Sequence, residues 1–444
     1  MIRTDISPDS PVEEQPAIGV IGMGSMGTMY AKFLYEGGWK KIYVCDQPSK
    51  YEALKAKYED NANVTVLVDG HQVSRIADFI MYSVEAEFIE RVVATYGPST
   101  KVGAIVSGQT SVKAPEKAAF EKYLPQDVHI VSCHSLHGPT VSPLGQPLVL
   151  IKHRAPEWAL RLVENILRPL KSRYVYLSYE DHDIVTANTQ AVTHAAFLSM
   201  GTAWANEKEY PWETGHAVGG IETVKVNIML RIYSNKWHVY AGLAILNPSA
   251  RRIYAARDTV FGTKAHDGGG AVRTPILLSE DILDRFSLWR GRSSGANGNG
   301  KANGNGTGDA PPNTHLANSH LSLLAMVDCW AALGIQPFVH LDLAATPLFR
   351  MLLGVSEYLF QSQERLDHAI HAALYDTTYR ANDLEFVVAA RGWSQCISFG
   401  SFELYQRRFM ETAEFFEPRF EDAQKVGTAM LQAILETPPT TKTS

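Results

Sequence analysis

Three glycines near the start of the chain constrain its fold more than any other feature. Gly22, Gly24 and Gly27 follow the apolar run Ala17–Ile21 and open a segment with helical spacing. In this setting the first glycine permits a tight turn, the second lets a ligand approach the backbone, and the third lets the helix pack closely on the strand. The N–H groups and positive dipole end at the helix start suit a phosphate, so the pattern predicts dinucleotide binding. The residues expected at the pyrophosphate are Gly22, Gly24, Ser25, Met26 and Gly27.

The order of apolar runs and helical patterns predicts an α/β fold with two domains. Strand-like runs alternate with helical segments, as a parallel sheet covered by helices requires, at 17–21, 41–45, 64–68, 79–82, 102–107, 128–133, 148–152 and 174–177. Beyond residue 178 the spacing becomes helical, as in 184–204, 222–246 and 321–333. We therefore expect a Rossmann-type dinucleotide-binding domain over 17–178 and a mainly α-helical domain over 179–440.

Two segments lack the composition of a packed core. Residues 1–16 carry three prolines and four acidic residues, and we expect a flexible N-terminus. Residues 291–313 consist mostly of Gly, Asn, Ser and Ala, which cannot bury enough apolar surface to offset the entropy of ordering. Helical spacing resumes directly afterwards, so this stretch is predicted to be a disordered insertion within the helical domain.

Composition excludes several classes of partner. The net charge of −6 over 444 residues gives no electrostatic reason to expect nucleic acid or an anionic membrane. The four cysteines form no CxxC pair, which argues against a disulfide framework or a cysteine-built zinc site. No apolar stretch approaches the ~20 residues that span a bilayer, and the N-terminus resembles neither a signal nor a transit peptide. A cytoplasmic protein is the simplest expectation.

The second predicted strand ends in a residue that bears on the choice of cofactor. Asp46 stands where a carboxylate would accept hydrogen bonds from the adenosine ribose, which favours NAD. Ser49 and Lys50 lie just beyond it and are placed to contact a 2′-phosphate, which favours NADP. From the residues alone, both cofactors remain open.

Polar residues follow two strands at the edge where the ligand crevice of such a sheet lies. Ser111 follows the strand at 102–107, and either faces the ligand or caps the next helix. His134 closes the strand at 128–133 and is followed by His137. An imidazole beside a nicotinamide is well placed to take the proton of a hydroxyl whose carbon loses hydride, and its ordinary pKa suits that work near neutral pH.

The helical part offers two further polar features. His182 lies between Asp181 and Asp183, but the chain shows no set of three or four ligands at metal-site spacing, so no metal is expected. Arg231 suits the two-pronged recognition of a carboxylate, although a surface ion pair explains it equally well.

Taken in order, four segments resemble prephenate dehydrogenases. The run from His134 to Pro139 is similar to that family's His-Pro-Met-x-Gly-Pro signature, with Ser135 in place of the usual proline. Ser111-Val112-Lys113 resembles the Ser-Val-Lys that precedes it. The other two segments are Gln190-Ala191-Val192-Thr193-His194, similar to Gln-Ala-x-x-His, and the arginine-led segment Arg231–Asn235.

The resemblance implies oxidative decarboxylation of prephenate to 4-hydroxyphenylpyruvate in tyrosine biosynthesis. His134 would handle the hydroxyl proton, Ser111 would hold His134 or the hydroxyl, and Arg231 would grip a substrate carboxylate. The same resemblance places His194, Lys113 and Gln190 at the substrate. Similarity to the fungal branch favours NADP over NAD, and the family's organisation implies a homodimer formed through the helical domain.

Two alternatives remain open at this point. The glycine loop is also typical of β-hydroxyacid dehydrogenases, whose later helix carries a lysine with an asparagine four residues on. Here Gly219-Gly220 leads to Lys225, but Asn227 comes only two residues later. The second alternative is a non-catalytic sensor that binds NAD(P) without turnover.

Overall fold

The computed structural model describes residues 6–139, 141–208, 210, 213, 221–260, 320–340, 347–377 and 380–436. The chain forms two compact units. The first comprises Met1–Thr189, His238–Arg251 and Val339–Thr346, and the second comprises Gln190–Trp237, Arg252–Phe338 and Pro347–Ser444. The insertion expected at 291–313 lies outside the described residues.

The first unit is built on one sheet with the order β3-β2-β1-β4-β5-β6-β7-β8. Its strands are β1 (Ile18–Ile21), β2 (Ile42–Cys45), β3 (Val64–Val66), β4 (Phe79–Tyr82), β5 (Ile105–Gly108), β6 (His129–Ser135), β7 (Pro147–Lys152) and β8 (Arg173–Tyr176). All neighbours pair in parallel except β6 and β7, which are antiparallel. The chain returns from β6 to β7 without a crossover helix, and a return of that kind reverses the strand direction.

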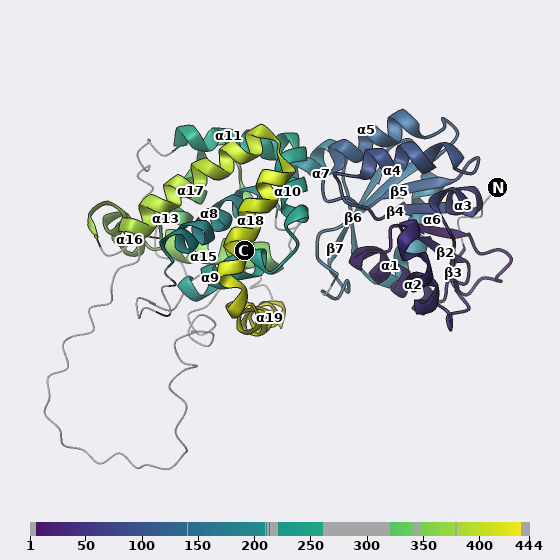
Figure 1. Cartoon of the computed structure of the whole chain (residues 1–444), viewed down its shortest axis with the longest axis horizontal. Helices are drawn as coiled ribbons and strands as arrows, with labels where there is room; N and C mark the ends of the chain where they lie inside the picture. The colour runs from purple at the N-terminus through teal and green to yellow at the C-terminus, as the bar shows by residue number, and fades with distance from the viewer. Residues whose placement is uncertain are drawn as a thin grey trace, which may run out of the picture. The chain divides into compact units, whose positions relative to one another are not determined.

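Helices cover both faces of this sheet (Figure 1). They are α1 (Ser25–Glu36), α2 (Tyr51–Lys57), α3 (Gly70–Ile76), α4 (Ile89–Tyr96), α5 (Lys113–Tyr123), α6 (Glu157–Leu167) and α7 (Tyr179–Thr186), with short 3-10 turns at Pro48–Lys50, Gly97–Ser99 and Arg168–Leu170. Side chains alternate along each strand. Val20 and Met81 pack with α1 and α6, whereas Ile21 and Ile80 pack with α4 and α5. Burial on both faces explains why the strands read as continuous apolar runs.

The second unit is helical. It contains α8 (Val192–Glu207), α9 (Ile221–Tyr233), α13 (Leu321–Ala332), α15 (Pro347–Phe360), α16 (Gln363–Tyr375), α17 (Arg380–Phe399), α18 (Phe402–Phe416) and α19 (Phe420–Glu436), with 3-10 turns at Pro337–His340 and Glu417–Arg419. Every residue of α8 from Val192 to Trp204 is buried, because α9, α13, α17 and α18 pack around it. An apolar helix without a polar face is typical of such a central position.

The division between the units differs from the boundary expected at 178/179. The first unit continues to Thr189, inside a π-helical turn at Ala187–Ala191. Helix α10 (Trp237–Leu246) lies mostly in the first unit, and α11 (Pro248–Val260) spans the change at Arg251/Arg252. Sequence spacing identifies these helices but not the unit against which each of them packs.

Residues 6–16 are packed rather than flexible, which corrects the expectation for 1–16 within its described part. Ile6 is 4% exposed and joins the core that contains α1. The Gln15 amide donates to the carbonyls of Pro8 and Ser10, while its oxygen accepts from the N–H of Lys40. One apolar anchor and one fully engaged amide hold a segment whose composition suggested a free tail.

Candidate active site

The glycine loop between β1 and α1 has the shape that a dinucleotide phosphate requires. Gly22 has φ +100°, and a side chain there would collide with the carbonyl of Ser83. A side chain at Gly27 would collide with the carbonyl of Gly22, so this glycine is needed for close packing of the helix. A side chain at Gly24 would meet no atom within 4 Å, and α1 begins without a side-chain cap. Open space beside uncapped N–H groups fits a pyrophosphate.

Asp46 follows β2 directly and is already engaged by its surroundings. One carboxylate oxygen accepts from the N–H of Met23 at 3.0 Å, and the other accepts from the N–H of Gln47 at 2.7 Å. The Lys50 ammonium lies 3.3 Å from that second oxygen and its side chain is 57% exposed. Ser49 is also exposed on the same 3-10 turn. The end of β2 therefore presents a lysine and a serine to solvent beside a carboxylate that the loop already uses.

His134 lies near the carboxyl end of β6 and is 7% exposed. Its Nδ1 is 2.8 Å from Nε2 of His182, which belongs to α7. The Nδ1 of His182 is in turn 3.0 Å from Oδ1 of Asp183. Three side chains thus form one continuous chain of hydrogen bonds that ends in a carboxylate.

Burial keeps both imidazoles neutral. Burial, followed by the nearby His182, Lys113 and His137, lowers the pKa of His134 well below its ordinary value. Burial and then Lys113 lower the pKa of His182 in the same way. A neutral imidazole has one lone pair that can accept a proton, which is the state that the proposed proton transfer needs.

Asp183 also holds the start of α5. Its two carboxylate oxygens accept from the N–H groups of Lys113 and Ala114, each at 2.8 Å. The cap residue of α5 is Val112, without a side-chain bond, so the alternative role of Ser111 as helix cap is not observed. Ser111 is half-buried in the turn between β5 and α5, and its contact with His134 stays a prediction.

Lys113 is not placed to contact a substrate, which corrects the expectation from its motif. Its side chain is 0% exposed and its ammonium is bound by the carbonyls of Gly108 and Cys133 and by both oxygens of Glu116. The carbonyls belong to β5 and β6, so this lysine ties together the two strand ends that carry the polar residues. A buried ammonium with all three protons bound has none left for a ligand.

Ser135, which departs from the family signature, makes a contact that proline could not make. It is the last residue of β6, and its hydroxyl lies 2.5 Å from the phenolic oxygen of the fully buried Tyr30 on α1. The strand that carries His134 is therefore bonded to the helix that follows the glycine loop. The imidazole stays in place despite the departure.

Three expected site residues belong to the second unit, which is described by itself. Gln190 lies in the π-helical turn, His194 in the first turn of α8, and Arg231 in the last turn of α9. Burial lowers the pKa of His194 to about 3, so this imidazole is neutral. Arg231 is half-buried. Their meeting with His134 at one substrate stays a prediction.

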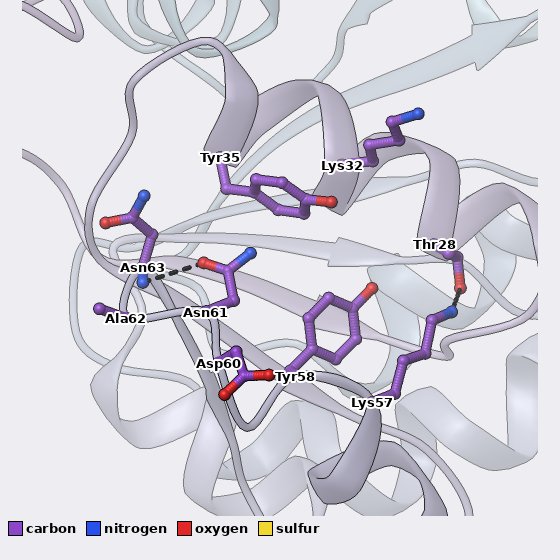
Figure 2. Close-up of a pocket in the computed structure, with 9 residues that line it drawn as sticks. All are labelled: Thr28, Lys32, Tyr35, Lys57, Tyr58, Asp60, Asn61, Ala62 and Asn63. Atoms are coloured by element: carbon purple, nitrogen blue, oxygen red, sulfur yellow. Dashed lines mark hydrogen bonds between the residues drawn. The ribbon is translucent and has the colours of Figure 1, made fainter.

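A cavity of about 570 Å³ opens elsewhere in the first unit (Figure 2). It is lined by Thr28, Lys32, Tyr35, Lys57, Tyr58, Asp60, Asn61, Ala62 and Asn63. These residues come from α1, from α2 and from the turn before β3, and none belongs to the ends of β5 or β6. The cavity is therefore separate from His134.

Among the described residues, no three His, Cys, Asp or Glu side chains gather as metal ligands would. Within the same part of the chain, no helix is both long and apolar enough to cross a membrane.

Sequence reasoning overlooked the roles of His182 and Asp183. The Asp-His-Asp triplet drew attention only as a metal candidate. A signal was present, since a histidine beside an acid near the start of a helix can be oriented by that acid, but its partner His134 lies 48 residues away.

Comparisons with known proteins agree with this geometry. A family model described as "NADP oxidoreductase coenzyme F420-dependent" matches residues 17–107. A second, described as a "6-phosphogluconate dehydrogenase C-terminal domain", matches residues 191–252 and 250–436. A crystal structure of prephenate dehydrogenase from A. aeolicus covers 55% of this chain and 87% of that chain, with a TM-score of 0.45 and 18% identity.

Two fungal relatives are much more similar. The probable prephenate dehydrogenase (NADP(+)) of Schizosaccharomyces pombe is 48% identical over 448 residues, which cover 96% of this chain and 99% of the relative. The prephenate dehydrogenase (NADP(+)) of Saccharomyces cerevisiae is 48% identical over 449 residues, 94% of each chain. These relatives favour the dehydrogenase resemblance over a β-hydroxyacid dehydrogenase or a sensor. The chain belongs to the family of NADP(+)-dependent prephenate dehydrogenases.

Proposed function

We propose that the protein oxidises and decarboxylates prephenate to 4-hydroxyphenylpyruvate with reduction of NADP⁺, a step of tyrosine biosynthesis. The observation that carries this proposal is the neutral, buried imidazole of His134 near the carboxyl end of β6, in the same unit as a loop shaped for a dinucleotide phosphate. A proton acceptor near a hydride acceptor is the arrangement that oxidation of an alcohol carbon requires.

The residues of this chain would mainly orient the substrate and move one proton. When bound, NADP⁺ supplies the acceptor for the hydride that leaves the ring carbon bearing the hydroxyl. His134 takes the hydroxyl proton as that hydride departs. The bond to the ring carboxylate breaks, CO₂ leaves, and the electron pair of that bond completes the aromatic ring. The proton returns from His134 to the phenolic oxygen, so the imidazole is unchanged at the end. Aromatisation drives the reaction, which leaves positioning as the protein's largest contribution.

Residues outside this pair would bind the substrate. Arg231 would grip a carboxylate through two parallel hydrogen bonds, with Gln190 and His194 lining the same pocket and Ser111 holding the hydroxyl or His134. Lys113 takes no such part, because its ammonium is fully engaged in the core. We further propose a cytoplasmic homodimer associated through the helical unit, as expected for this family.

The decisive experiment follows NADPH absorbance after mixing the protein with prephenate and either NADP⁺ or NAD⁺. We expect absorbance to rise with NADP⁺ and much less with NAD⁺, and 4-hydroxyphenylpyruvate and CO₂ to form in equal amounts. No product from prephenate, together with reduction of NADP⁺ by a small 3-hydroxy acid, would instead support a β-hydroxyacid dehydrogenase. Binding of both NADP⁺ and NADPH without turnover of any substrate would support a sensor.

The exposed Lys50 is expected to set the preference for NADP⁺. Its ammonium lies beside Asp46 at the end of β2, where a 2′-phosphate would be placed. A hydrogen bond to a charged group is worth about 1.5–3 kcal/mol, so Lys50→Ala should raise the KM for NADP⁺ about tenfold. The KM for NAD⁺ should not rise.

The matched control is Lys152→Ala, which removes an exposed lysine paired with Glu157 at the far end of β7. Its KM values should equal those of the unaltered protein. Equal increases for NADP⁺ and NAD⁺ in Lys50→Ala would contradict a contact with the 2′-phosphate.

A further inference from the structure

A buried chain of hydrogen bonds behind His134 has no counterpart in the residues that the sequence assigned to the site. It runs from His134 to His182 and ends at Asp183, and all three residues belong to the first unit. His182 is 0% exposed and Asp183 is 7% exposed as a side chain, so water is largely excluded from both. Buried polar groups in such a chain must be matched donor to acceptor, and this requirement fixes the position of each proton.

Protons are assigned from the carboxylate outward. An ionised carboxylate only accepts, and Asp183 already accepts from two backbone N–H groups. Nδ1 of His182 must therefore donate to it. Since His182 is neutral, its Nε2 then carries a lone pair, and that lone pair accepts from Nδ1 of His134. The remaining nitrogen of His134, Nε2, is left with its lone pair free of a proton.

We propose that His182 and Asp183 are positioning residues that hold His134 in its Nδ1–H form, so that Nε2 is the proton acceptor. This inference rests on the proposed function for its catalytic consequence, while the assignment of the tautomer stands on the hydrogen bonds alone. The nitrogen that carries the proton in a neutral histidine is set by the bond that the other nitrogen makes. His182 supplies that bond, and Asp183 gives His182 its direction.

The carboxylate also predicts how this arrangement responds to pH. Burial raises the pKa of Asp183 to about 6, against the opposing effect of the two N–H groups and of Lys113. The charged and titratable groups around it are Lys113 from α5, Glu180 and His182 from its own helix, and His134 beyond. As the pH falls through about 6, Asp183 gains a proton and no longer compels Nδ1 of His182 to donate. Above that pH the direction of the chain is fixed, so kcat should fall on the acid side near pH 6.

The first test reads the proton directly. Long-range ¹H–¹⁵N spectra of protein labelled at histidine, with His134→Asn used for assignment, report which ring nitrogen is protonated in the absence of substrate. At pH 7.5, roughly the middle of the neutral range, we expect the Nδ1–H form of His134 in the unaltered protein. In His182→Phe, which keeps a ring of similar shape but offers no acceptor, we expect the Nε2–H form to predominate. An Nε2–H form of His134 in the unaltered protein would overturn the proposal.

The second test reads turnover. His182→Phe should lower kcat roughly 10- to 100-fold, less than the ~10²–10⁴-fold that general acid–base catalysis contributes as a whole. KM for prephenate and for NADP⁺ should stay within about twofold, because His182 touches neither in this proposal. His182→Gln should restore most of the rate, since its amide oxygen can accept from His134. A rate for His182→Gln as low as that of the phenylalanine variant would contradict the proposed role.

The matched control is His153→Phe, which alters a histidine bonded to Glu121 just past the end of β7, at the opposite edge of the sheet. It should leave both kcat and the spectrum of His134 unchanged, and thermal unfolding of each variant shows whether the fold is retained. The two tests separate this inference from the proposed function. No turnover of prephenate with an Nδ1–H imidazole would overturn only the function, whereas turnover with an Nε2–H imidazole would overturn only this inference.

Discussion

Replacing His134 with asparagine is expected to lower kcat by ~10²–10⁴-fold, the range typical for loss of general acid–base catalysis. Asparagine is smaller than histidine and stays uncharged, so the end of β6 should keep its hydrogen bonds to β7. The glycine loop is a separate segment of the same unit, and the Kd for NADP⁺ should therefore be unchanged. Stopped-flow measurement of NADPH formation, together with fluorescence titration of the cofactor, checks both halves of this expectation.

His129→Asn provides the matched control. His129 begins the same strand and packs edge-on against Trp158, well away from the carboxyl end of the sheet. We expect its kcat to match that of the unaltered protein. A normal kcat in His134→Asn would remove the basis of the assigned reaction, and a parallel loss of cofactor affinity would indicate damage to the loop instead.

Replacing Lys113 with methionine is expected to destabilise the protein by ~3–5 kcal/mol, the cost of leaving a buried charge without its partner. The lysine and Glu116 are both 0% exposed and 2.9 Å apart. Without the ammonium, the Glu116 carboxylate keeps hydrogen bonds from Thr110 and Ser132 but loses its counter-charge. The carbonyls of Gly108 and Cys133 lose a donor as well. Urea unfolding measured by circular dichroism gives the free energy of unfolding directly.

Lys117→Met is the matched control, four residues further along the same helix. Lys117 pairs with Glu180, whose side chain is 64% exposed, and surface pairs of this kind contribute about 0–1 kcal/mol. If the two variants lose similar stability, Lys113 does not hold the strand ends as described. If Lys113→Met folds normally and only raises the KM for prephenate, the motif's assignment of this residue to the substrate was right and our correction is wrong.

Much of the fold could be predicted because its cause is local. The alternation of apolar runs and helical spacing, and the glycines that close packing at Gly22 and Gly27 requires, are both visible along the chain. The reversal of β7 could not be predicted, since it depends on how an irregular connection of residues 136–146 returns to the sheet. The packing of Ile6 was missed for a similar reason, because a single buried side chain leaves no periodic pattern.

The site was only partly predictable. The position of His134 follows from a strand and its end, which sequence reveals. Lys113 was assigned to the substrate because a motif gives the residue but not the direction of its side chain, and here Glu116 lies one turn away and holds the ammonium in the core. The pairing of His134 with His182 depends on how α7 returns to β6, which no local pattern records.

The bond between Tyr30 and Ser135 has a mechanical consequence. Tyr30 stands just past the first turn of the helix that would anchor the cofactor's phosphates, and Ser135 is the immediate neighbour of the imidazole. One buried pair of hydroxyls therefore acts as a strut that sets the spacing between phosphate anchor and base. In a reaction whose rate depends on bringing hydride acceptor and proton acceptor to the same hydroxyl-bearing carbon, that spacing is built into the scaffold before either ligand arrives.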